Sequence, residues 1–207
     1  MIWKSSEGSN VAAQYAGALA LGYLNFKDDP NFESSNYLKV AEDLYEFANR
    51  TSPFKAGDSL GEYYQDGDDG DDKAWAANWL YIATSKSMYK NNRAMDPGQL
   101  QWDDVSMATA IAYATQTNDW AAVIDKINSE YINPNSNIDG TNVSRKEFYS
   151  IHSWGTARFN AIAQTATLIT AKHLYENGTK THTDRNTYAK IANGYVSWAK
   201  GQMDKIL

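Results

Sequence analysis

Small residues recur at helical spacing along much of this chain. Segment 10–26 carries alanine on nearly every face of a helix, and segment 155–176 repeats this composition. Segment 36–49 instead places its apolar residues on one stripe and its charged residues on the opposite face. A helix with small residues all round can pack on several sides, whereas an amphipathic helix needs one covered face. The pattern therefore predicts an all-α protein with two layers of helices.

Seven helical segments are predicted, and no segment shows the alternation typical of strands. They cover residues 10–26, 36–49, 72–89, 103–115, 119–131, 155–176 and 184–206. Ser9 or Asn10 is a suitable N-cap for the first helix, and Gly178 is a suitable C-terminal stop for the sixth. Residues 133–144, rich in Asn, Ser, Pro and Gly, are expected to form a loop. Because the sequence shows neither a linker nor a fixed repeat period, it predicts one domain over residues 1–207.

The charge balance argues against several classes of partner. The net charge is −6 over 207 residues and the pI is about 5.0, with no basic run longer than two residues. A phosphate backbone needs a basic surface, so nucleic acid is not expected as a partner. Apolar residues are interrupted throughout, which predicts no membrane span. The lack of cysteine removes disulfides, thiolate metal sites and a cysteine nucleophile.

Aromatic residues with a polar group are frequent, since the chain has 7 Trp and 14 Tyr against 6 Phe. Their flat apolar faces and polar edges suit sugar rings and hydroxyls. Residues 153–159 read Ser-Trp-Gly-Thr-Ala-Arg-Phe, with Arg158 four residues after Trp154. This spacing predicts a sugar-binding platform. Helix–helix contacts in large helical proteins use the same residue types, so that interpretation stays open beside it.

Five aspartates crowd into residues 66–72. Water or a cation must screen their mutual repulsion, and hard oxygen ligands on a glycine-containing loop favour Ca²⁺. Asp103 is a candidate ligand shared with this loop. The spacing is not that of an EF-hand, because Ala77 stands where the last ligand belongs. The alternative is a solvated loop in which Asp71 and Asp72 complement the dipole of the next helix.

The residues alone assign no catalytic group. Carboxylate pairs within residues 68–72 share one loop, whereas an inverting glycosidase needs its acid and base on opposite sides of the scissile bond. His152 is predicted to be packed or hydrogen-bonded beside Trp154. His173 and His182 are predicted to lie at the surface. No Ser-His-Asp arrangement follows from these positions.

Five blocks in order along the chain resemble the catalytic domain of glycoside hydrolase family 9, the family of many cellulases. Residues 8–14 resemble the segment that leads into its alanine-rich inner helix, and residues 36–49 resemble its Ala-x-x-Leu-Tyr-x-Phe-Ala helix. Residues 70–81 resemble its Asp-Glu block with the following Trp-Leu-Tyr. Residues 153–159 resemble its Trp-Gly-x-x-Arg-Tyr motif, and residues 195–207 resemble the helix before its Gly-Asp-Asn turn. The resemblance covers nearly the whole chain.

This resemblance implies an incomplete six-hairpin α/α barrel (an α/α toroid) and inverting hydrolysis of β-1,4-glucans, chiefly cellulose, without an organic cofactor. It implies that the full-length protein is secreted, although residues 1–4 lack the apolar core of a signal peptide. It assigns the substrate contacts to Tyr63, Trp154 and Arg158. It assigns the calcium ligands to Asp68, Asp71, Asp72 and Asp103.

The sequence also departs from the family pattern. Asp66 stands at about the place of a family tryptophan, and Asp72 replaces a glutamate. Neither the Asp-Ala-Gly-Asp element that supplies the family's base nor the segment with its acid glutamate has a counterpart in residues 1–207. We therefore expect a central fragment with uncovered apolar faces, inactive alone. The alternatives are a non-catalytic helical oligosaccharide-binding module and another α/α-barrel glycosidase.

Overall fold

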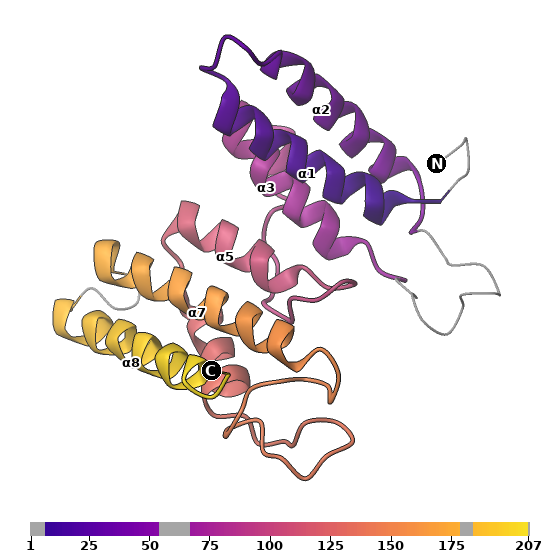
Figure 1. Ribbon diagram of the computed structural model, residues 1–207. Helices are drawn as coiled ribbons and strands as arrows, with labels where there is room; N and C mark the ends of the chain where they lie inside the picture. The colour runs from indigo at the N-terminus through magenta and orange to yellow at the C-terminus, as the bar shows by residue number, and fades with distance from the viewer. Residues whose placement is uncertain (1–6, 54–66, 179–183, 207) are drawn as a thin grey trace. The chain divides into compact units, whose positions relative to one another are not determined.

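The computed structural model describes residues 7–53, 67–178 and 184–206 (Figure 1). The all-α prediction is confirmed, since these residues form helices and loops with isolated β-bridges and no strand. The backbone groups into two compact units, each of which is described by itself. The first comprises residues 1–95 and 102–112, and the second comprises residues 96–101 and 113–207.

Three helices form most of the first unit: α1 (Ser9–Phe26), α2 (Ser34–Arg50) and α3 (Gly70–Thr84). α1 packs on both α2 and α3, and Figure 1 shows the three running side by side. The buried residues of α1 are all small or polar: Ser9, Asn10, Ala12, Ala13, Ala16, Gly17 and Ala20. The prediction that this helix packs on more than one side is therefore confirmed.

α1 and α3 approach each other closely at Gly17. A Cβ atom on Gly17 would stand 2.5 Å from Nε1 of Trp75 and 3.4 Å from Cα of Ala76. Trp75 in turn meets Trp79 edge to face, with ring centroids 5.2 Å apart. The two helices fit together here because residue 17 has no side chain.

Two local features of the first unit differ from the predicted helices. The predicted helix 72–89 is broken at Ser85, whose φ of 57° ends α3 before the short α4 (Ser87–Lys90). The N-cap of α1 is Gly8, not one of the two polar residues that follow it. Gly8 has a φ of 110°, a conformation that glycine adopts without a steric penalty.

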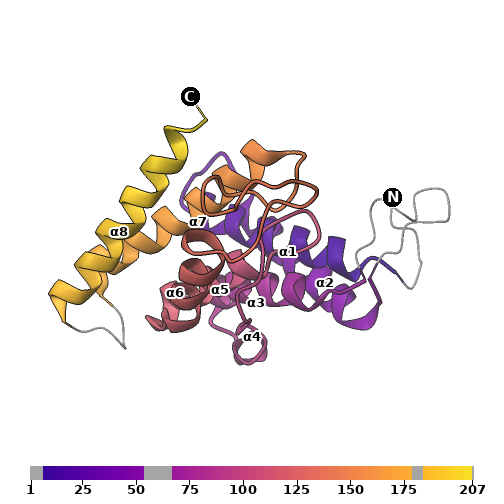
Figure 2. The same cartoon turned by 90° about the horizontal axis from the view of Figure 1, so that it is seen from below.

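In the second unit, α7 (Thr156–Asn177) and α8 (Arg185–Met203) form an antiparallel pair (Figures 1 and 2). Gly178 ends α7 as predicted, with a φ of 66°. The side chain of Asp184 caps α8 by accepting a hydrogen bond from Thr187 N at 2.9 Å. None of the helices in the described ranges is long and apolar enough to cross a bilayer.

The fifth predicted helix changes its winding partway along. α6 (Ala121–Lys126) runs directly into a π-helix, η1 (Ile127–Ile132), whose hydrogen bonds span five residues instead of four. Tyr131 near the end of η1 is buried and packs on Tyr149, with ring centroids 4.9 Å apart. The π winding therefore determines the direction in which the Tyr131 ring leaves the helix.

Candidate functional site

The predicted acidic site lies at the start of α3, in the first unit. Asp71 and Asp72 occupy the first turn of α3, and both are buried. Oδ2 of Asp71 accepts a hydrogen bond from Val105 N at 2.6 Å, and Oδ1 of Asp72 accepts one from the Gln14 amide of α1 at 2.7 Å. These two residues are therefore not solvated, although they lie in the first turn of α3, where the alternative interpretation expected them to complement the helix dipole. Their carboxylates join α3 to α1 and to the segment before α5 (Ser106–Thr117).

The surroundings of Asp71 disfavour its charged form. Burial raises the pKa of Asp71 above its ordinary value of 3.8, and the nearby negative charge of Asp104 acts in the same direction. The hydrogen bond from Val105 N opposes them. Asp104 itself accepts a hydrogen bond from Ser106 N at 2.8 Å, so it supports the start of α5. This helix begins three residues later than the predicted position at residue 103.

Asp68 and Asp69 make contacts around the start of α3. Asp68 is exposed and accepts a hydrogen bond from Gly70 N at 2.9 Å. Asp69 pairs with Lys73 at 2.7 Å and accepts a hydrogen bond from the Ser9 hydroxyl, which ties the start of α3 to the start of α1. An aspartate four residues before a lysine at a helix start is the signal that identifies this ion pair in the sequence.

The predicted calcium ligands do not converge on one point. In the described parts of the chain, no three Asp, Glu or His side chains converge closely enough to hold a metal ion. Calcium takes about six to eight oxygen ligands. Asp68, Asp71, Asp72 and Asp103 therefore do not form a ready cage, and main-chain oxygens and water would have to complete it. Calcium binding stays a prediction.

Trp154 of the second unit is 58% exposed, just before α7 begins. Gly155 separates it from the helix and takes a φ of 61°, a left-handed conformation that a side chain would strain. The indole meets Phe159 edge to face with ring centroids 5.8 Å apart, and Phe159 is buried beneath. The guanidinium carbon of Arg158 lies 5.3 Å from the centre of the indole and 4.5 Å from that of Phe159. Trp154 and Arg158 are thus brought together, whereas Tyr63 lies outside the described residues.

His152 is packed and paired, as predicted. Its ring stacks on Trp154 with centroids 5.3 Å apart and an interplanar angle of 5°. Nδ1 of His152 lies 3.3 Å from Oδ2 of Asp139. The sequence prediction missed Asp139, whose only signal was its place beside Gly140 in the predicted loop.

The surface prediction for His173 is wrong, and His182 lies outside the described residues. His173 is half-buried and stacks on Trp120, with ring centroids 5.2 Å apart. Burial lowers its pKa, and the positive charge of Lys172 adds to the effect. Trp120 stands 53 positions earlier in the sequence, so the helical pattern around His173 gave no sign of this contact.

Buried amides fix the segment that leads to Trp154. Nδ2 of Asn160 on α7 donates hydrogen bonds to the Tyr149 carbonyl at 3.0 Å and to Oε1 of Gln202 at 2.8 Å. The same Gln202 oxygen accepts a hydrogen bond from Tyr149 N at 3.0 Å. Both amide side chains are buried, so the main chain of Tyr149 is held to α7 and α8 at once.

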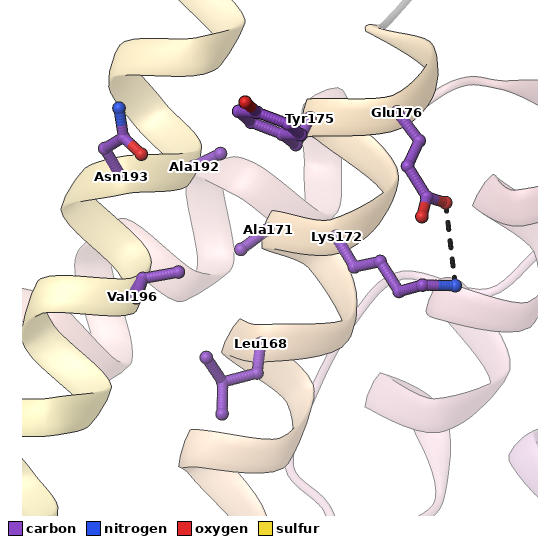
Figure 3. A pocket seen from close by; sticks show the side chains of 8 residues that line it. All are labelled: Leu168, Ala171, Lys172, Tyr175, Glu176, Ala192, Asn193 and Val196. Carbon is purple, nitrogen blue, oxygen red and sulfur yellow. Dashed lines mark ion pairs between the residues drawn. The ribbon is translucent and has the colours of Figure 1, made fainter.

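A groove of about 230 Å³ lies between α7 and α8 (Figure 3). Leu168, Tyr175 and Val196 face it, and the Lys172–Glu176 ion pair lies beside it with a separation of 3.5 Å. Ligand pockets in proteins usually have about 300–1,000 Å³ and several convergent polar groups. The groove is smaller and mostly apolar, so we assign it no ligand.

Known proteins resemble this chain over part or nearly all of its length. The family model "Glycosyl hydrolase family 9" matches residues 1–207. Endoglucanase 1 of Persea americana is 26% identical over 97% of this chain and 44% of its own length. Endoglucanase 2 of Arabidopsis thaliana is 40% identical over 84 residues, which are 40% of this chain and 16% of that protein.

Solved structures resemble the chain in fold. The cellulase Cel9M of C. cellulolyticum gives a TM-score of 0.70 at 26% identity, over 97% of this chain and 44% of its own. The endoglucanase of the termite Nasutitermes takasagoensis gives 0.68 at 26% identity, over 93% of this chain and 44% of its own. The predicted incomplete α/α barrel is confirmed, and the chain spans less than half the length of these relatives. The chain belongs to glycosyl hydrolase family 9.

Proposed function

We propose that this chain serves the hydrolysis of β-1,4-glucosidic bonds in cellulose or related β-glucans, by an inverting mechanism. The observation that carries the proposal is the family match over residues 1–207. The names of its relatives, which are endoglucanases and a cellulase, support the substrate class. Because the chain spans less than half the length of these relatives, we assign it the binding of the glucan and not the chemical step.

The proposed contact is stacking of a glucose ring on Trp154. A pyranose ring has an apolar face of C–H groups, which an exposed indole covers while its N–H edge stays available for polar contacts. Trp154 offers such an indole at 58% exposure. Arg158 lies beside it, and its guanidinium carries several donors for sugar hydroxyls.

The chemical step needs groups that residues 1–207 do not match. Inversion requires a general acid and a general base about 6.5–9.5 Å apart, with room for a water molecule. Neither of the family's two catalytic segments has a counterpart in this sequence. We expect the purified chain to bind cello-oligosaccharides without releasing reducing ends from carboxymethylcellulose. Measurable release by this chain would contradict that assignment.

Calorimetric titration with cellohexaose tests the proposed contact. Trp154→Ala is expected to weaken binding about tenfold, because it removes the stacking face, whereas Trp154→Phe keeps a flat ring and most of the affinity. Tyr15→Ala is the matched control, since Tyr15 is 63% exposed on α1 in the first unit. Failure of the unaltered chain to bind, or an equal loss in the control, would refute the contact.

The linkage preference is tested with the same titration. A site shaped for β-1,4-linked glucose is expected to bind cellohexaose more tightly than maltohexaose or laminarihexaose, because the linkage sets the angle between successive rings. Tighter binding of either other sugar would favour a different α/α-barrel glycosidase.

The proposal also places the protein's action outside the cell, because cellulose is an insoluble polymer.

Calcium binding is the remaining part of the proposal. A ligand that binds only the folded state stabilises it, by about 2.7 kcal/mol at a hundredfold excess over its Kd. We expect CaCl₂ to raise the thermal midpoint and a chelator to reverse the rise. Asp72→Asn should remove the response, and Asp204→Asn, a change at an exposed residue just after α8, should keep it. A midpoint that does not respond to calcium would contradict this part.

A further inference from the structure

The indole of Trp154 has one neighbour that lies flat against it. The His152 ring is nearly parallel to the indole, at 5° with centroids 5.3 Å apart, within the usual range for offset stacking. His152 also meets Phe159 edge to face at 5.4 Å. An exposed tryptophan on a chain turn would otherwise be free to change rotamer, so the imidazole is the group that limits its rotation on this side.

His152 is held in turn by Asp139. Oδ2 of Asp139 lies 3.3 Å from Nδ1 of His152, and the two residues also form a parallel β-bridge. Asp139 N donates a hydrogen bond to the Ile151 carbonyl at 3.2 Å, so the main chain fixes the carboxylate beside the ring. Nothing in the β-glucan contact described above involves Asp139 directly.

Arg145 braces the other side of the Asp139 carboxylate. Its Nη2 lies 3.6 Å from Oδ1 of Asp139 and donates a hydrogen bond to the Ile151 carbonyl at 3.2 Å. The Arg145 side chain is only 11% exposed, whereas that of Asp139 is 64% exposed. The carboxylate is therefore a solvent-facing group whose direction is set by a mostly buried cation and by the main chain.

We infer that Asp139 and His152 are positioning residues, which orient the Trp154 indole for its sugar. The inference rests on the proposed glucan contact and adds two residues that do not themselves stack on the glucose ring. An ordered indole binds with less loss of side-chain freedom, and immobilising one such group is worth about two- to tenfold in affinity. The loop that carries Asp139 thus tunes the affinity of a platform that lies 15 positions later in the chain.

The test compares four variants by two measurements. Asp139→Ala removes the carboxylate beside Nδ1 of His152, and His152→Leu removes the flat ring. Both are expected to weaken cellohexaose binding about two- to tenfold. Asp139→Asn keeps an acceptor for the imidazole, and His152→Phe keeps a flat ring, so each is expected to restore most of the affinity. In a Trp154→Ala background, none of the four should change the remaining binding.

The second measurement reports the indole itself. The Trp154 contribution to near-ultraviolet circular dichroism is obtained by subtracting the spectrum of Trp154→Phe. This contribution should fall sharply in Asp139→Ala and His152→Leu and persist in the two conservative variants. Glu176→Ala is the matched control, because it breaks an exposed ion pair about 30 Å along α7 from Thr156.

The outcomes separate this inference from the proposed function. If the unaltered chain does not bind cellohexaose, the glucan contact fails, and the dichroism alone decides whether Asp139 and His152 order the indole. An unchanged Trp154 spectrum in Asp139→Ala overturns the inference. So does a loss of binding that is equally large in the Trp154→Ala background, because it would show a purely structural role.

Discussion

His173 shows how one half-buried imidazole on α7 makes stability depend on pH. Its pKa lies below 6.5, first because of burial against Trp120 and second because of the positive charge of Lys172, with Glu176 opposing. The unfolded chain therefore binds a proton more readily than the folded chain. The stabilisation of the folded state by neutral His173 is complete above pH 6.5, and it is lost as the pH falls from there through the lowered pKa.

This pH effect can be measured by urea unfolding. Between about pH 7.5 and about pH 5, the unaltered chain should lose more unfolding free energy than His173→Phe, which keeps a ring on Trp120 but binds no proton. The two proteins differ only at residue 173, so the difference between their pH curves reports that residue. Parallel pH curves for the two proteins would contradict the effect.

Gln202 gives a second prediction at this scale. Gln202→Ala leaves Tyr149 N without its acceptor and removes one of the two acceptors of Asn160 Nδ2, so it should cost about 1–3 kcal/mol of unfolding free energy. Asn193→Ala removes an amide from an exposed position of the same helix and should change stability by less than about 0.5 kcal/mol. Equal losses of unfolding free energy in the two variants, measured by chemical denaturation, would argue against a stabilising role of the Tyr149–Asn160–Gln202 hydrogen bonds.

Single-residue roles were only partly predictable from the sequence. The Trp154–Arg158 pair was predicted from the four-residue spacing, although Trp154 lies before α7 and only Arg158 lies in its first turn. The burial of Asp71 and Asp72 does not follow from spacing, since their hydrogen-bond partners, Val105 and Gln14, are 34 and 58 positions away. An acidic run indicates solvent exposure unless the folded chain supplies such partners.

At the scale of elements, the contact between α1 and α3 depends on Gly17. Gly17→Ala adds a Cβ atom 2.5 Å from the Trp75 ring, and relieving that overlap should cost about 1–3 kcal/mol. Gly22→Ala on the same helix meets nothing within 4 Å and should stabilise by up to about 1 kcal/mol through helix propensity. Thermal melts of both variants measure these two changes in stability. A higher thermal midpoint in Gly17→Ala would show that α1 and α3 can move apart to accept the methyl group.

Helices were easier to predict than the points where they change. Periodic small and apolar residues marked α1, α2, α7 and α8 to within three residues at each end. The break at Ser85 depends on a single positive φ, and η1 differs from an α-helix only in its hydrogen-bond spacing, so neither leaves a periodic signal in the sequence. Gly8 was missed as an N-cap because a polar residue beside it is the commoner choice.

For the whole molecule, charge predicts how the affinity for two kinds of ligand responds to salt, since the net charge of the chain is −6. A glucan is neutral and releases no counterions, so the Kd for cellohexaose should change by less than about twofold between about 50 mM and about 500 mM NaCl. Duplex DNA should not bind at either concentration, because the sequence has no basic run longer than two residues. A steep salt dependence in calorimetry, or retention of DNA in a gel, would contradict this.

The π-helical stretch η1 has a consequence for how such a protein can vary. It accommodates one residue more than an α-helix with the same ends, so deleting one residue would rewind it. Each residue turns an α-helix by about 100°, and a ring displaced by that angle would leave its partner. An insertion or deletion in η1 can therefore reorient the Tyr131 ring, which packs on Tyr149 in the segment before Trp154, without any substitution at Trp154 itself.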